Sequence, residues 1–174
     1  PERLVSVDGD RIETEGLAGS IGRGETADED EWLEKQLRAS EKNSHEHDIV
    51  VETIQEQLAP FTSEITTGGR QIRKLANVQH LQTPIRANLD EEYHVLELVE
   101  ALHPTPAVGG LPPERARETI RETEVFDRGW YAAPVGWFDA DGNGTFAVAI
   151  RSAVARDRKA TLFAGPGIGV GRDL

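Results

Sequence analysis

The sequence predicts a domain of the α+β class (mixed α/β), and three observations support this. Two short segments, residues 3–7 and 11–14, flank Asp8-Gly9-Asp10, a turn sequence typical of a tight hairpin. Apolar side chains then recur at helical spacing in the first half of the chain. Strand-like runs return near the C-terminal end. Helices combined with adjacent antiparallel strand pairs favour α+β over a wholly parallel sheet.

Helices are expected in four places. A charged helix should run from about Asp28 to Ser40, and Asn43 or Ser44 should cap the next helix. Residues 90–102 have the apolar spacing of an amphipathic helix. Residues 112–124 open with two prolines, which the first turn of a helix tolerates, and continue as a polar helix.

Strands and loops fill the remaining sequence. Three short strands are expected within residues 61–88, and three longer ones, joined by two hairpins, within residues 130–164. Asp, Asn and Gly at residues 139–144 predict a hairpin turn. Four glycines are expected in one loop after the first hairpin: Gly16, Gly19, Gly22 and Gly24. The short strands are expected at residues 72–75, 78–81 and 85–87, and the longer ones at residues 130–138, 145–153 and 160–164.

The composition limits the classes of partner. The 31 acidic and 19 basic residues give a net charge of −12, which opposes binding to nucleic acid and to anionic membranes. Two explanations of the acidity stay open. One is an ordinary solvated surface, and the other is adaptation to high internal salt, which the scarcity of Lys favours.

Size and residue usage give further expectations. A chain of 174 residues can bury one core. No apolar run is long enough for a membrane span, no signal peptide is visible, and Cys is absent, so a cytoplasmic setting fits. The chain begins with Pro1 and contains no Met, so we expect a piece of a longer protein.

Several motifs follow one another in a fixed order, at residues 1–4, 17–24, 40–47, 102–112, 126–137, 146–153 and 163–169. Together they resemble the chorismate-utilising enzymes. The resemblance covers the entire chain and implies a fold like that of anthranilate synthase component I, with large β-sheets and outer helices. Residues 1–174 would then be a single partial chorismate-binding domain, truncated at both ends.

The loop at residues 105–110 separates the subfamilies. Amine-forming members usually carry a Gly-Ala-Pro-Lys segment here, whereas this chain has Gly110 followed by Leu111-Pro112-Pro113. The pattern is most similar to the isochorismate synthases, which implies Mg²⁺-dependent isomerisation of chorismate for menaquinone biosynthesis. Three alternatives stay open: a salicylate synthase, an anthranilate or aminodeoxychorismate synthase, and a catalytically dead binding domain of the same fold.

The resemblance assigns an acid and a metal ligand. Glu2 matches the general acid that protonates the departing hydroxyl, although a Glu near a chain end is more often simply exposed. Glu46 matches a Mg²⁺ ligand, although a Glu near a helix N-terminus also interacts favourably with the helix dipole.

The remaining matches bind substrate. Tyr131 and Arg151 match the pair that holds the enolpyruvyl carboxylate, and the planar fork of Arg can clamp a carboxylate at two points. His80 matches a histidine near the substrate ring. The alternatives are a satisfied strand histidine for His80 and an outward-facing strand arginine for Arg151. The other substrate-binding positions are small residues: Gly19, Ser20, Ala107, Gly165 and Gly167.

The resemblance also places two functional parts outside the chain. The family's base Lys would lie before Glu2, and its second metal-ligand segment would follow Leu174. We therefore expect the isolated chain to be inactive and to bind Mg²⁺ weakly or not at all. Sheet edges left open by the truncation would allow a dimer to form.

Overall fold

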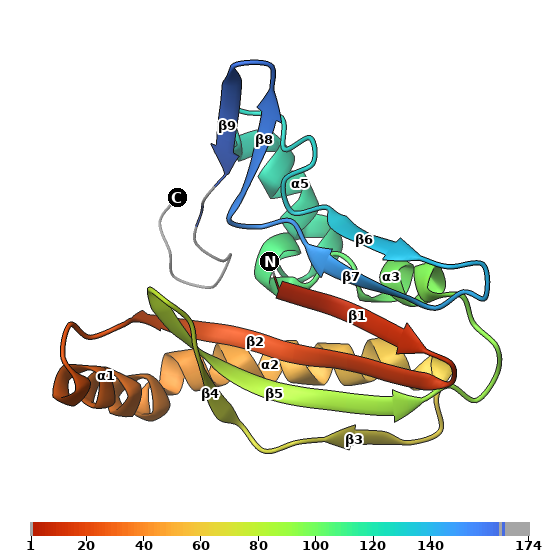
Figure 1. Cartoon of the computed structure of the whole chain (residues 1–174), viewed down its shortest axis with the longest axis horizontal. Coiled ribbons are helices and arrows are strands. Elements are labelled where there is room, and N and C mark those ends of the chain that lie inside the picture. Colours follow the sequence, from red (N-terminus) through yellow and green to blue (C-terminus); the bar gives the residue numbers. More distant parts are fainter. Residues whose placement is uncertain (1, 164, 166–174) are drawn as a thin grey trace. The chain divides into compact units, whose positions relative to one another are not determined.

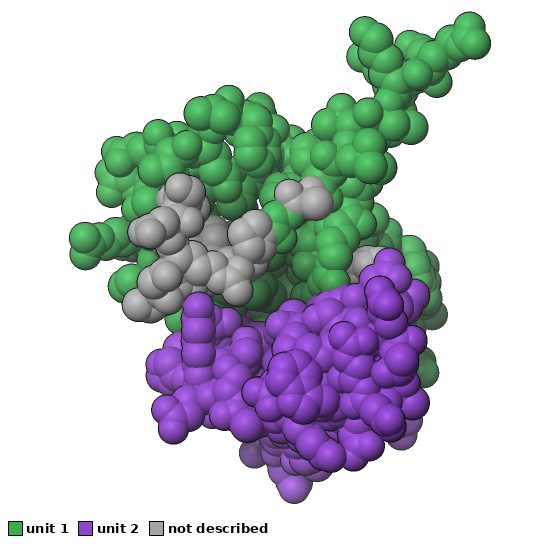
Figure 2. Space-filling model, turned by 90° about the vertical axis from the view of Figure 1, so that its left-hand side faces the viewer, with its two compact units in different colours: residues 1–9, 93–174 green, residues 10–92 purple. Residues whose placement is uncertain are grey.

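The computed structural model describes residues 2–163 and residue 165. The chain divides into two compact units, which Figure 2 shows in different colours. Unit 1 comprises Pro1–Gly9 and Tyr93–Leu174, and unit 2 comprises Asp10–Glu92. Both units combine helices with antiparallel strand pairs, so the predicted α+β class is confirmed.

Unit 2 is an antiparallel sheet with two helices. Its long strands are β2 (Arg11–Gly22) and β5 (Val78–Asn88), which pair along nearly their whole length. Two short strands, β3 (Ile65–Thr67) and β4 (Gln71–Lys74), pair with different parts of β5. Figure 1 shows helix α2 (Glu41–Leu58) running along β2 and β5. Helix α1 (Ala27–Ala39) precedes it, and a short 3₁₀ turn (Ala59–Phe61) ends it.

The core of unit 2 lies between the helices and one face of this sheet. Both the helices and the strands contribute fully buried aliphatic side chains, whose burial is the main favourable term in folding. They include Ile12, Leu37, Leu58, Leu81 and Ile85.

Two strand predictions in unit 2 are wrong. The four glycines were expected in a loop, but β2 continues through Gly16 and Gly19 to Gly22. A Cβ at Gly16 would lie 2.6 Å from Cγ2 of Val51, so the glycine lets α2 pack closely on the strand. The strands expected at residues 78–81 and 85–87 form one unbroken strand, β5.

The helix predictions in unit 2 are confirmed apart from one cap. Helix α1 runs over almost the expected residues. Helix α2 begins earlier than expected, because its N-cap is Ser40 rather than Asn43 or Ser44. The Ser40 hydroxyl accepts a hydrogen bond from the backbone N–H of Asn43 at 3.3 Å.

Unit 1 contains a three-stranded antiparallel sheet and a separate hairpin. Strand β7 (Gly144–Val148) lies between β1 (Glu2–Asp8) and β6 (Pro134–Phe138). Strands β8 (Ser152–Arg156) and β9 (Lys159–Phe163) form the hairpin. The helices are α3 (Val95–Leu102), α4 (Pro106–Gly109) and α5 (Pro113–Thr123).

The core of unit 1 forms where α3 packs against β1 and β7. Helix α3 and the two strands all contribute buried aliphatic side chains to this core. They include Val5, Val95, Leu98, Leu102 and Val148.

The turn predictions in unit 1 are confirmed. Strand β1 ends at Asp8 and is followed by Gly9, whose φ of 60° is a left-handed conformation that suits glycine. The turn between β6 and β7 is closed by the Asp139 carboxylate, which accepts hydrogen bonds from the backbone N–H groups of Asp141 and Asn143.

Three boundaries in unit 1 differ from the prediction. Helix α3 starts at Val95 instead of residue 90, because His94 caps it and forms a capping box with Glu97. The strand expected at residues 145–153 ends at Val148, and β8 begins at Ser152. The first long strand begins at Pro134 rather than at residue 130. The expected end of the last strand, Ala164, lies outside the described residues.

None of the helices in the described part of the chain is both long enough and apolar enough to cross a membrane.

Candidate functional site

In unit 1, Glu2 and Arg151 form an ion pair. The pairing of β1 with β7 places Glu2 opposite Val148, at the end of β7. Arg151 follows three residues later with a φ of 49°, a conformation that takes the chain away from β7. Its Nη2 donates a hydrogen bond to Oε1 of Glu2. The Arg151 side chain is 43% exposed and the Glu2 side chain 21%, so a solute could reach both groups.

Backbone hydrogen bonds of the residues after Tyr131 hold this segment beside the same end of β7. The backbone N–H of Ala132 donates to the carbonyl of Ala149 at 3.0 Å, and the N–H of Ala149 donates to the carbonyl of Ala133 at 2.9 Å. The Tyr131 ring stacks on Phe163 with ring centres 5.4 Å apart. Glu2, Tyr131 and Arg151 are therefore gathered around the segment that follows Val148.

Gly165 passes close to the Tyr131 hydroxyl. A Cβ at residue 165 would lie 3.1 Å from Oη of Tyr131, tighter than an ordinary van der Waals contact. Glycine therefore fits this position without crowding the tyrosine. Gly167, also expected to bind substrate, lies outside the described residues.

Arg128 connects α4 to Tyr131. Its Nη1 donates to the carbonyl of Val108 at 3.0 Å, beside Ala107 on α4. Its Nε donates to Glu124 at 2.7 Å, and its guanidinium carbon lies 5.7 Å from the centre of the Tyr131 ring. The ion pair raises the pKa of Arg128 and lowers that of Glu124.

Sequence reasoning assigned no role to Arg128, although it lies in one of the quoted motifs. The available signal was the spacing to Glu124, four residues earlier just beyond the end of α5. The contact with the Val108 carbonyl had no sequence signal.

In unit 2, a β-bulge aligns Ser20 with His80. Ala18 pairs with Leu81 and Ser20 pairs with His80, so Gly19 is an extra residue in β2. Its φ is 76°. Because side chains alternate between the two faces of a strand, this insertion moves Ser20 onto the face that His80 occupies. The Ser20 hydroxyl then lies 2.6 Å from Nδ1 of His80.

The bulge also lies against the start of α2. A Cβ at Gly19 would be 3.0 Å from Cβ of Asn43 and 3.1 Å from Cδ1 of Leu81. Glycine is therefore needed at residue 19 both for its positive φ and for space.

His47 fastens α2 to the sheet near this bulge. Its imidazole is fully buried, with Nδ1 3.2 Å from the carbonyl oxygen of Ala18 and Nε2 2.7 Å from Oγ1 of Thr83. Burial lowers the pKa of His47. The orientation of α2 against β2 and β5, which also places Glu46, therefore depends partly on a neutral histidine.

Glu46 lies on α2 next to His47. Its carboxylate is 28% exposed, with Oε1 4.0 Å from Nζ of Lys42, so the group is accessible to an ion. Among residues 2–163 and 165, no three His, Asp or Glu side chains gather to hold a metal. Glu46 could therefore supply one oxygen ligand to Mg²⁺, but the described residues do not form a full coordination set.

The predicted site residues thus form two sets, one in each unit. Unit 1 holds Glu2, Tyr131, Arg151 and Gly165 around the end of β7, with Ala107 connected through Arg128. Unit 2 holds Gly19, Ser20 and His80 at the bulge, with Glu46 on the adjoining helix. The first set offers a guanidinium cation and a carboxylate, and the second offers a hydroxyl–imidazole pair.

Comparison with known proteins identifies the family. The model of the chorismate binding enzyme family matches residues 1–172. The chain therefore belongs to this family, as its motifs predicted.

Individual relatives agree with this assignment. The chain is 49% identical over 169 residues to the salicylate biosynthesis isochorismate synthase of Pseudomonas aeruginosa, and 48% identical over 169 residues to isochorismate synthase MenF of Bacillus subtilis. The solved structure of MenF, the menaquinone-specific isochorismate synthase of Escherichia coli, superposes with a TM-score of 0.90 at 34% identity.

The comparisons also give the extent of the match. The two sequence alignments cover 97% of this chain but 36% of each relative. The structural match covers 99% of this chain and 40% of the MenF chain. The chain thus spans well under half the length of these relatives.

Proposed function

We propose that the chain is part of an isochorismate synthase, an isomerase that converts chorismate to isochorismate. The observation that carries the proposal is 48–49% identity, over almost the whole chain, to two relatives that are both named isochorismate synthases. The grouping of Glu2, Tyr131 and Arg151 at one end of β7 gives the proposal a chemical basis.

The reaction makes two demands on these residues. Water must add to one ring carbon while a hydroxyl leaves from another, so the hydroxyl must be protonated as its bond breaks. The substrate carries two carboxylates and must be held by cationic and donor groups. In our proposal Glu2 supplies the proton, while Arg151 and Tyr131 hold the enolpyruvyl carboxylate.

The ion pair suggests how binding and acid chemistry are coupled. In this structure a donor of Arg151 is engaged by Glu2. A substrate carboxylate would compete for the same guanidinium, and a bidentate Arg–carboxylate pair would displace Glu2. Glu2 would then be released from the cation beside it, and loss of that neighbouring charge favours the protonated carboxyl form that an acid catalyst needs.

The unit 2 residues orient the substrate in this proposal. The short contact with Ser20 fixes the direction of the His80 ring. His80 would then lie near the substrate ring, and the backbone at Gly19 and Ser20 would approach the substrate closely.

Mg²⁺ would assist by neutralising a substrate carboxylate. Glu46 is the residue of this chain that we assign to it, because its carboxylate is accessible and carboxylates suit Mg²⁺. The roles assigned here include neither a base that activates water nor a full metal site, so we propose that the 174 residues alone bind substrate without turnover.

Within the isochorismate synthases we propose the menaquinone-specific type, in the cytoplasm. Its support is the likeness to the MenF proteins of two bacteria. The Pseudomonas relative makes isochorismate for salicylate instead. It supports the same reaction but not the same pathway.

The experiment that tests the reaction uses heavy-oxygen water. A longer form of the protein that contains this chain is incubated with chorismate and Mg²⁺ in labelled water, and the products are separated and weighed by mass spectrometry. Isochorismate carrying one heavy oxygen is expected, because the new hydroxyl comes from solvent and the old one departs. An unlabelled product, or an amine formed when ammonia is added, would contradict the proposal. The 174-residue chain under the same conditions should form no product.

A further inference from the structure

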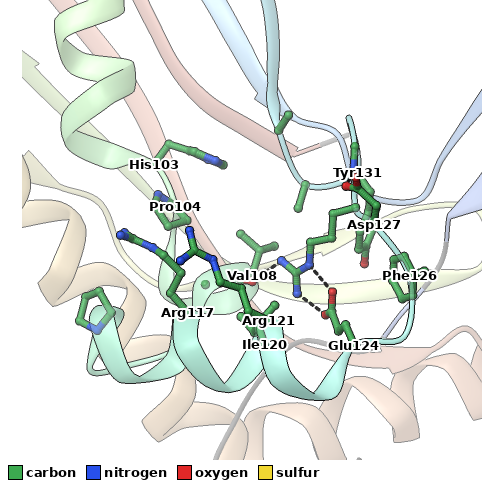
Figure 3. Close-up of a pocket in the computed structure, with 16 residues that line it drawn as sticks. His103, Pro104, Val108, Arg117, Ile120, Arg121, Glu124, Phe126, Asp127 and Tyr131 are labelled. Atoms are coloured by element: carbon green, nitrogen blue, oxygen red, sulfur yellow. Dashed lines mark hydrogen bonds and ion pairs between the residues drawn. The ribbon is translucent and has the colours of Figure 1, made fainter.

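A pocket lies within unit 1, and Tyr131 is one of its lining residues. It has a volume of about 490 Å³ and lies between the end of α3, α4, α5 and the loop that leads to Tyr131. Figure 3 shows its lining side chains converging from these segments. Neither Glu2 nor Arg151 lines it. The functional proposal uses only Tyr131 of these lining residues and gives no role to the part of the pocket formed by α5.

Two exposed arginines of the pocket have no partner among the residues that the structure describes. Arg117 and Arg121 are one helical turn apart on α5, and both line the pocket. Within residues 2–163 and 165, neither side chain makes a hydrogen bond or an ion pair. Arg128, by contrast, is satisfied by Glu124 and by the Val108 carbonyl.

The rest of the wall is mixed. It includes the carboxylates of Glu124, which is paired with Arg128, and of Asp127, which accepts a hydrogen bond from the N–H of Gly129, together with apolar side chains. Ile120 lies between the two arginines in sequence, and Pro104 and Phe126 also line the space. His103 lines it as well, and its buried Nδ1 has no hydrogen-bond partner in the described part of the chain. Burial lowers the pKa of His103, so the imidazole is neutral at neutral pH. Arg117 and Arg121, beside these apolar side chains and a neutral ring, suit an anion with an apolar body, because both carboxylates of the wall already accept hydrogen bonds within the protein.

We propose that this pocket binds a small organic carboxylate. Its charged group pairs with Arg117 and Arg121, and its ring or chain lies against Ile120 and Pro104. Guanidinium groups match carboxylate geometry. The overall negative charge of the chain repels anions, so affinity comes from this local arginine pair.

The test titrates benzoate into the isotope-labelled 174-residue chain at constant ionic strength and follows the NMR signals of α5 and of the arginine side chains. The signals of Arg117 and Arg121 should shift and saturate. The double variant Arg117→Gln/Arg121→Gln should bind at least about tenfold more weakly, since a hydrogen bond to a charged group is worth about that factor. Arg115→Gln removes the same charge from the same helix outside the pocket and should change the affinity less than about twofold.

One further variant and one further ligand test the same proposal. Arg151→Gln should leave the benzoate shifts on α5 unchanged, which distinguishes binding at the α5 arginines from binding at Arg151. Inorganic phosphate should bind more weakly than benzoate, because it has no apolar body. Equal affinity of the double variant and Arg115→Gln would overturn the proposal, as would phosphate binding as tightly as benzoate. Circular dichroism checks that each variant is folded.

Discussion

The hydroxyl of Ser20 lies 2.6 Å from Nδ1 of His80 because Gly19 adds one residue to β2. Without that residue, the alternation of the strand would turn Ser20 toward the opposite face. One glycine thus determines which side chain accompanies the imidazole. Local backbone geometry here sets the composition of the candidate site.

Substitution of this glycine should be costly. Gly19→Ala forces a side chain into a φ of 76° and places its Cβ 3.0 Å from that of Asn43. The strained φ costs about 1–2 kcal/mol, and crowding adds to it. Gly9→Ala is the matched control, because Gly9 has a φ of 60° and no atom within 4 Å of the added Cβ. Urea unfolding should show a larger loss for Gly19→Ala, and equal losses would refute the crowding argument.

Acid should destabilise the chain through His47. Burial lowers the pKa of this histidine in the folded state, whereas in the unfolded chain its pKa should be about 6.5. Below that pH the unfolded state binds more protons, so the free energy of unfolding should fall as the pH falls. Burial also lowers the pKa of His103, so this residue should contribute to the pH dependence in the same direction.

The measurement is urea unfolding at several pH values between neutral and mildly acidic. The variant His47→Gln should be less stable at neutral pH, but its stability should depend less on pH than that of the parent chain. An unchanged pH dependence in the variant would show that His47 is not the group responsible.

Arg128 should contribute to the stability of unit 1. Arg128→Gln removes the ion pair with Glu124 and the hydrogen bond to Val108, in a side chain that is only 25% exposed. The expected loss is about 1–3 kcal/mol. Arg86→Gln breaks a pair in which the Arg side chain is 66% exposed and should have little effect. Thermal unfolding of both variants checks this, and similar losses would argue against a special role for Arg128.

Salt should stabilise the chain if its acidity is an adaptation to high salt. The net charge of −12 produces self-repulsion that is strong in dilute buffer and screened at high ionic strength. The melting temperature should therefore rise between dilute buffer and molar KCl. A melting temperature that stays constant would favour an ordinary solvated surface.

Local signals in the sequence sufficed for elements with clear ends. Helix α5 was predicted because Pro113 suits a first turn, and the β6–β7 hairpin because Asp139 and Asn143 are turn residues. Helix α3 was misplaced at its start because His94 is an unusual N-cap, and its capping box with Glu97 is visible only in the structure.

Long-range packing accounts for the failures. Gly16 and Gly19 suggested a loop, but their role is to let α2 approach β2, and that contact is invisible in the sequence. Pro84 lacks a backbone N–H donor, which disfavours the interior of a strand. It nevertheless lies inside β5, where it pairs with Glu15 and its carbonyl accepts a hydrogen bond from the N–H of Gly68. The site residues came from motif resemblance, whereas the Glu2–Arg151 pair and the bulge required the fold.

The central claim is that Arg151 holds a carboxylate of chorismate, and calorimetric titration with chorismate tests it most directly. The titration uses the Arg117→Gln/Arg121→Gln background, so that the α5 pocket does not contribute. Adding Arg151→Lys removes the bidentate fork and should weaken binding at least about tenfold. Arg156→Lys, an exposed change on β8, should leave the affinity unchanged. Equal affinities for the two variants would contradict the claim.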